Sequence, residues 1–165
     1  MIVIVEGIDR VGKTTFCEKA ASLLNAPVFK QTTFHDDGSH PGPTAMVEQV
    51  HALTKLLLCI NSNIVVDRFH LTEAVYGKID RGYDCLQEMK AIDSMLSRRK
   101  DIVLAYVEPT DIEESSRQHG DDLSPHASMF AQMFTDSQIQ NKVSCNYKTI
   151  CQAMLWLSNL RSKVS

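Results

Sequence analysis

Residues 7–15 read Gly-Ile-Asp-Arg-Val-Gly-Lys-Thr-Thr. This stretch matches the pattern G-x-x-x-x-G-K-T of a phosphate-binding loop, in which glycines let the backbone approach phosphate groups closely. The run Met1–Val5 before it is apolar and rich in β-branched residues, which predicts a buried parallel strand. The residues from Thr14 onward predict an amphipathic helix. Strand, loop and helix together aim backbone N–H groups at one place, so we expect a nucleoside triphosphate to bind there.

The loop residues divide the expected work of holding ATP and its metal. Lys13 is expected to reach the β- and γ-phosphates, and the Thr14 hydroxyl is expected to ligate Mg²⁺. Backbone groups of the whole loop complete the expected ATP site, which comprises Gly7, Ile8, Asp9, Arg10, Val11, Gly12, Lys13, Thr14 and Thr15.

Length and composition favour one soluble domain. The chain has 165 residues, which predicts a single domain spanning 1–165, and its 44% hydrophobic and 22% charged residues are ordinary for a globular protein. The net charge of −3 gives no sign of a general nucleic-acid binder, although a local basic groove for nucleic acid stays open.

The cysteines and apolar runs favour a cytoplasmic protein without a membrane segment. The five cysteines are scattered and form no C-x-x-C pair, which is typical of a reducing compartment. The N-terminal apolar run is too short for a signal peptide, and residues 53–60 are too few to cross a bilayer.

Strand-like runs alternate with helical stretches along the rest of the chain. This alternation predicts βαβ units in an α/β P-loop fold of three layers, with about five parallel strands and helices on both faces. The expected strands are residues 1–5, 27–29, 63–66, 101–107 and 146–150. The expected helices start at Thr14 and cover residues 44–60, 71–77, 85–99 and 127–143, with a last helix ending at Leu160.

A second pair of polar residues, Asp67-Arg68, ends the third expected strand. Ligands in parallel α/β sheets gather at the carboxyl ends of the strands, so both side chains should lie beside the phosphate loop. Asp67 is expected to hold Mg²⁺ through its water shell, and Arg68 can bind a phosphate with two parallel hydrogen bonds. Glu6 either positions the groups that ligate the metal, without ligating it itself, or is a buried acid paired with other residues.

Together the two motifs resemble those of the thymidylate kinase family. Val5-Glu-Gly-Ile-Asp-Arg-Val-Gly-Lys-Thr-Thr15 is similar to that family's E-G-x-D-x-x-G-K-S-T. Asp67-Arg-Phe-His-Leu-Thr-Glu-Ala-Val-Tyr76 resembles D-R-Y-x-x-S-x-x-A-Y, with Phe69, Thr72 and Val75 as departures. The resemblance implies a kinase domain with a lid, for which residues 112–126 are the candidate.

The resemblance also implies roles for two arginines and a tyrosine. The family carries its catalytic arginine in the loop or in the lid, and here Arg10 has the loop position, as in the family's eukaryotic and viral members. Arg117 is the lid's own arginine and is expected to contact ATP. Tyr76 is expected to border the acceptor's sugar, with core packing as the alternative.

The acceptor is less well defined, because the family's arginine-glutamate-proline segment is absent after the second strand. Here the chain reads Phe29-Lys-Gln-Thr-Thr-Phe34, in which Phe34 could stack on a base or cover the core. A hydroxyl acceptor needs a carboxylate base, and the related deoxynucleoside kinases carry a glutamate at this point. Lys30 and Gln31 stand there instead, which favours a monophosphate acceptor.

The sequence therefore predicts a kinase that moves the ATP γ-phosphoryl group to a deoxynucleoside monophosphate similar to dTMP. The alternatives are a kinase of a nucleoside or modified-base hydroxyl, with Asp9 as base, and a non-catalytic nucleotide-binding module. A homodimer is also left open. The expected catalytic residues are Asp9, Arg10, Lys13, Asp67 and Arg68, and the expected acceptor site is Asp9, Phe34, Arg68 and Tyr76.

Overall fold

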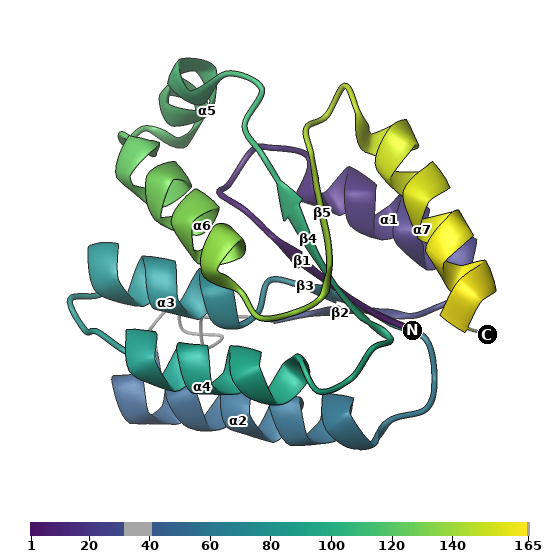
Figure 1. Ribbon diagram of the computed structural model, residues 1–165. Coiled ribbons are helices and arrows are strands. Elements are labelled where there is room, and N and C mark those ends of the chain that lie inside the picture. The colour runs from purple at the N-terminus through teal and green to yellow at the C-terminus, as the bar shows by residue number, and fades with distance from the viewer. Residues whose placement is uncertain (32–40, 165) are drawn as a thin grey trace.

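A five-stranded, all-parallel sheet forms the centre of the protein (Figure 1). The computed structural model describes residues 1–31 and 41–164. The strands lie in the order β2-β3-β1-β4-β5. Their bounds are Ile2–Glu6 (β1), Val28–Lys30 (β2), Ile64–Asp67 (β3), Ile102–Val107 (β4) and Asn141–Cys145 (β5). The expected α/β fold with parallel strands is confirmed.

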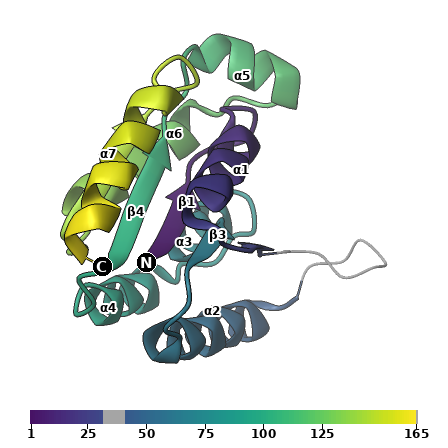
Figure 2. The ribbon, with the colours of Figure 1, turned by 90° about the vertical axis from the view of Figure 1, so that its right-hand side faces the viewer.

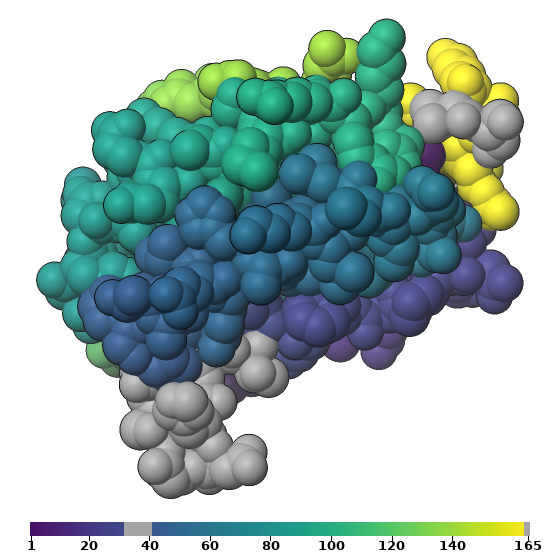
Figure 3. Space-filling model, turned by 90° about the horizontal axis from the view of Figure 1, so that it is seen from below, coloured from purple at the N-terminus to yellow at the C-terminus, as the bar shows by residue number. Residues whose placement is uncertain are grey.

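Helices cover both faces of this sheet, which gives the expected three layers. The helices are Lys13–Leu24 (α1), Pro43–Cys59 (α2), His70–Ile79 (α3), Leu86–Leu96 (α4), Ile112–His119 (α5), Ser124–Asp136 (α6) and Ile150–Val164 (α7). Helices α1 and α7 lie side by side on one face, and α2, α3, α4 and α6 cover the other (Figures 1 and 2). Seen from below, α2 and α4 run along the same side of the molecule (Figure 3).

The three central strands carry the core. Every residue of β1, β3 and β4 is buried, as the apolar β-branched runs predict. Their registers bring Ile2 opposite both Ile64 and Ile102, so the strands end at nearly the same level. The phosphate loop and Asp67-Arg68 therefore leave the sheet at one edge. No helix in the described part of the chain is long and apolar enough to cross a membrane.

The last strand lies earlier in the chain than the sequence predicts. Residues 127–143 do not form one helix and 146–150 is not a strand, because α6 ends at Asp136 and β5 covers Asn141–Cys145. Lys142 stops the helix by donating from Nζ to the carbonyls of Phe134, Thr135 and Ser137 at 3.0, 3.0 and 3.1 Å. These side-chain contacts to the last carbonyls cannot be read from helical periodicity.

Candidate active site

The phosphate loop joins β1 to α1 and depends on its two glycines. Gly7 has a φ of 142°, and a Cβ at this position would lie 2.4 Å from the carbonyl oxygen of Val107. Gly12 caps the N-terminus of α1 with a φ of 94°. Both values suit glycine alone, so the loop can wrap closely around a phosphate in front of the helix N-terminus.

Lys13 lies in the first turn of α1 and points back into the loop. Its side chain is only 7% exposed, and Nζ donates to the carbonyl oxygen of Ile8 and lies 3.6 Å from Oδ1 of Asp9. Burial lowers the pKa of Lys13 to about 8, and the positive charge of Arg68 acts in the same direction. The loop thus holds a partly desolvated cation at the place where phosphates would enter.

Arg68 follows β3 and reaches the same place from the neighbouring strand. Its guanidinium group donates to Oδ1 of Asp9, which forms an ion pair across the two motifs. The backbone of Arg68 has a φ of 68°, and that of Arg10 has a φ of 66°, values that cost a non-glycine residue conformational energy. Strained residues of this kind cluster at functional sites.

Asp67 and Thr14 offer what a magnesium site of this type needs. Asp67 is buried at the end of β3, and its Oδ1 has no hydrogen-bond partner among the described residues. Thr14 exposes its side chain in the first turn of α1. Within the described ranges, no three His, Cys, Asp or Glu side chains gather as metal ligands. Mg²⁺ is usually held by one or two protein groups together with phosphates and waters, so the residues present fit.

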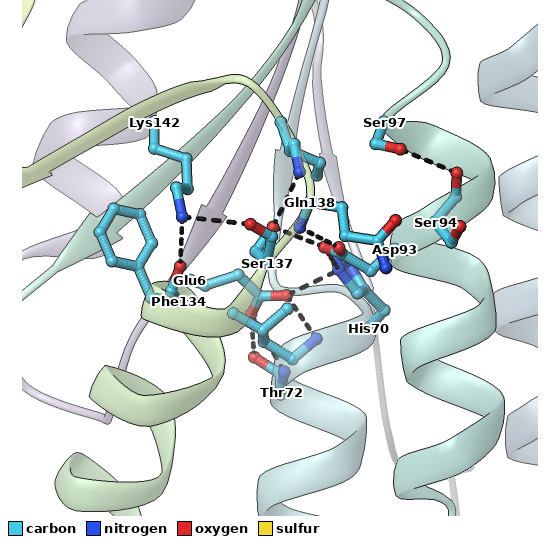
Figure 4. A network of polar contacts seen from close by, with 12 residues as sticks. Glu6, His70, Thr72, Asp93, Ser94, Ser97, Phe134, Ser137, Gln138 and Lys142 are labelled. Atoms are coloured by element: carbon cyan, nitrogen blue, oxygen red, sulfur yellow. Dashed lines mark hydrogen bonds and ion pairs between the residues drawn. The ribbon is translucent and has the colours of Figure 1, made fainter.

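The last residue of β1, Glu6, holds the start of α3 in place (Figure 4). Its buried carboxylate accepts hydrogen bonds from the backbone N–H groups of Leu71 and Thr72, at 2.9 and 3.2 Å, and from the Thr72 hydroxyl at 2.5 Å. Burial raises the pKa of Glu6. Of the two expectations for Glu6, the structure therefore shows the buried, paired acid. The contact links the donor loop to the helix that follows Arg68.

A buried histidine extends this network to α4 and to the end of α6 (Figure 4). His70 Nε2 lies 3.1 Å from Oδ1 of Asp93, and its Nδ1 lies 4.0 Å from Glu6. Asp93 also accepts from Ser137 Oγ and from the N–H of Gln138, both at 2.7 Å. Burial alone would raise the pKa of Asp93, but the hydrogen bonds from His70 and Ser137 keep it below the usual value. The network holds the start of α3 against β1, α4 and the end of α6.

The candidate lid brings a histidine to the loop in place of its arginine. Arg117 lies on α5 with its side chain 72% exposed and pairs with Glu114. His119, at the end of the same helix, places Nε2 at 3.7 Å from Oδ2 of Asp9. Arg10 is exposed on the loop itself. In the sequence, His119 falls within the candidate lid 112–126, and nothing there marked it as a neighbour of Asp9.

Tyr76, for which the acceptor role stays a prediction, packs against another histidine that sequence reasoning did not single out. Tyr76 lies on α3, and its ring packs against those of His126 and Phe130, with centroids 5.0 and 6.1 Å apart. Burial raises the pKa of Tyr76, and the charge of Asp9 adds to this. The Tyr76 hydroxyl and His126 Nδ1 are buried without a partner in the described residues. Phe34 lies outside the described residues.

Comparison with known proteins identifies the fold. No protein-family model matches the chain. The SPbeta prophage-derived protein YorR of Bacillus subtilis is 25% identical over 123 residues, which cover 73% of this chain and 70% of YorR. The crystal structure of a YorR protein from B. subtilis in complex with phosphorylated GDP superposes with a TM-score of 0.73, 19% identity and coverage of 99% and 98%.

Two solved thymidylate kinases have the same architecture. The enzyme from Candida albicans gives a TM-score of 0.58 at 16% identity, over 98% of this chain and 91% of the enzyme. The enzyme from Ehrlichia chaffeensis gives 0.59 at 14% identity, over 95% and 98%. The chain has the thymidylate kinase-like P-loop fold. In this thymidylate kinase-like fold, the strand edge that carries Lys13 and Arg68 is the candidate active site.

Proposed function

We propose that this protein transfers the γ-phosphoryl group of ATP to a deoxynucleoside monophosphate such as dTMP. The observation that carries the proposal is the junction at Asp9, where Lys13 from the start of α1 and Arg68 from the end of β3 approach one carboxylate. Two cations at one place would stabilise the negative charge of an acceptor phosphate. A monophosphate needs this kind of clamping more than it needs a base.

The residues of the site suit an in-line phosphoryl transfer. An oxygen of the acceptor phosphate would attack the γ-phosphorus while the bond to the departing ADP oxygen breaks. Lys13 and the loop amides would hold the donor phosphates, Arg10 would meet the charge of the transferring group, and Arg68 would orient the acceptor. Thr14 and Asp67 would hold Mg²⁺, which supplies further charge neutralisation when bound.

The similar proteins support a nucleotide ligand. Two of them are thymidylate kinases, and the YorR structure holds phosphorylated GDP. Arg117 remains a prediction as an ATP contact, because in the described structure it pairs with Glu114.

A hydroxyl acceptor is the second candidate, and the position of Asp9 favours it. The carboxylate lies between the donor loop and Arg68, within reach of either acceptor class. A base is essential for a hydroxyl acceptor and dispensable for a phosphate. Asp9→Asn should therefore reduce kcat about a hundredfold or more with a hydroxyl acceptor, and much less with a monophosphate.

The test is a donor and acceptor screen with labelled product. ATP or GTP with Mg²⁺ is combined with each nucleoside, each nucleoside monophosphate, and single- or double-stranded DNA. We expect a diphosphate product from one or a few monophosphates and none in the presence of a chelator. Labelled nucleoside or DNA as the only product would replace the proposal with the hydroxyl kinase. Nucleotide binding with no product from any acceptor would indicate the non-catalytic module.

A further inference from the structure

A cavity of about 480 Å³ lies between the edge strand β2 and helix α2. This volume is within the range of small-molecule sites. Its walls combine an aromatic ring, a cation, two amides and small apolar groups, from Phe29, Lys30, Gln31, Gln49, Ala52 and Leu53. Such a lining suits a flat ring with polar edges.

Two of the side chains that line the cavity differ in exposure. Phe29 belongs to β2, and Gln31 directly follows this strand. Phe29 is 43% exposed, which leaves a ring face open at the sheet edge. Gln31 is only 8% exposed, yet its Oε1 is buried with no hydrogen-bond partner in the described chain. A buried acceptor in this state calls for a donor from elsewhere.

The cavity adjoins the candidate acceptor site. Lys30 is in register with Asp67, and the Gln31 N–H donates to the Asp67 carbonyl at 3.2 Å. Gln31 therefore lies at the strand end next to the one that carries Arg68. A nucleotide whose phosphate binds Arg68 could extend its base along this edge into the cavity.

We propose that this cavity binds the nucleobase of the acceptor and that Gln31 determines which bases are accepted. The base stacks on Phe29 and donates a ring N–H to Gln31 Oε1. The ring N–H is present at N3 of thymine and uracil and at N1 of guanine, and absent from adenine and cytosine. The inference rests on the proposed function, since it names the base subsite of the same acceptor.

The experiment compares acceptors on the wild-type protein and on Gln31→Leu and Gln31→Glu. The acceptors are dTMP, dTMP methylated at N3, dGMP, dCMP and dAMP, with kcat and KM measured for each. The wild-type protein should prefer dTMP or dGMP, and N3 methylation should raise KM about tenfold or more. Gln31→Leu should erase the effect of methylation, with the KM for ATP unchanged. Gln31→Glu, which only accepts hydrogen bonds, should shift preference toward guanine, whose N1–H and N2–H₂ are neighbouring donors.

Thermal unfolding separates ligand recognition from a structural role. Because Oε1 has no partner to lose, Gln31→Leu should keep or raise the midpoint of unfolding. The matched control is Gln152→Leu on the exposed side of α7, which should leave both kinetics and stability unchanged. A lower midpoint together with unchanged discrimination among acceptors would overturn the inference.

The outcome for the proposed function is read separately. Suppose that the wild-type protein phosphorylates monophosphates and that the Gln31 variants show the same preference among acceptors as the wild-type protein. The inference then fails and the proposed function stands. If no acceptor is phosphorylated, the proposed function fails, and equilibrium binding of dTMP and N3-methyl dTMP decides the inference. Equal binding of the two by the wild-type protein would overturn it, and a weaker binding of the methylated compound that Gln31→Leu abolishes would support it.

Discussion

The buried carboxylate of Glu6 should be essential for both stability and acceptor binding. The change to test is Glu6→Gln, which keeps the shape of the side chain. Both carboxylate oxygens now accept from N–H groups, Oε1 from Leu71 and Oε2 from Thr72. A glutamine has one acceptor oxygen, so whichever way its amide turns, its NH₂ group faces a backbone N–H.

The expected loss follows from these contacts. A hydrogen bond to a charged group contributes about 1.5–3 kcal/mol, and a donor left facing a donor adds a cost of similar size. Burial disfavours the charged carboxylate and raises the pKa of Glu6. Because glutamine is neutral, it avoids this desolvation cost, which offsets part of the loss. The net fall in the free energy of unfolding should be about 2–4 kcal/mol. Since α3 starts just after Arg68, the KM for the acceptor should rise more than the KM for ATP.

The assay is urea unfolding combined with steady-state kinetics. Glu88→Gln is the control, because Glu88 is a glutamate in the first turn of α4 that is exposed, and its change should cost less than about 0.5 kcal/mol. A double-mutant cycle with Thr72→Val isolates the contact to the hydroxyl. If Glu6→Gln unfolds within about 0.5 kcal/mol of the wild-type protein, the argument for this cap is refuted.

Three further predictions concern the loop. The affinity for ATP should be full below pH 8 and fall by up to about tenfold per pH unit above it, because Lys13, whose pKa is about 8, must be charged to bind phosphate. Titration calorimetry checks this, and an affinity for ATP that does not change up to pH 10 would contradict it. His119→Ala should lower kcat about tenfold by removing the contact of α5 with Asp9, whereas unchanged kinetics would make that contact incidental. Gly7→Ala should destabilise the protein by about 3 kcal/mol or more and abolish nucleotide binding, because its Cβ meets the backbone oxygen of Val107; normal thermal unfolding would contradict this.

The central part of the fold follows from local sequence. The apolar runs that became β1, β3 and β4 are buried on both faces, and such runs bounded by polar residues identify parallel strands. The junction of Lys13 with Arg68 could also be foreseen, because the carboxyl ends of parallel strands meet at one edge.

What the sequence could not reveal depends on side-chain contacts that belong to no recognisable motif. The end of α6 is set by Lys142, whose ammonium group caps carbonyls of the preceding helix. His126 contacts Tyr76 because α6 packs across α3, where Asp80 also lies 2.8 Å from its Nε2. Neither residue belongs to a motif, so only the packed structure shows what it touches.

Position 68 combines a left-handed backbone with a side chain that must be positively charged, and no amino acid meets both requirements without a conformational cost. A φ of 68° is most easily adopted by glycine, followed by asparagine, whereas the ion pair with Asp9 requires a cation. Replacement by glycine would relax the main chain while removing the guanidinium group. A laboratory selection for heat resistance alone would therefore tend to enrich glycine at this position, and the selected proteins would be stable but would lack the guanidinium group that we propose orients the acceptor.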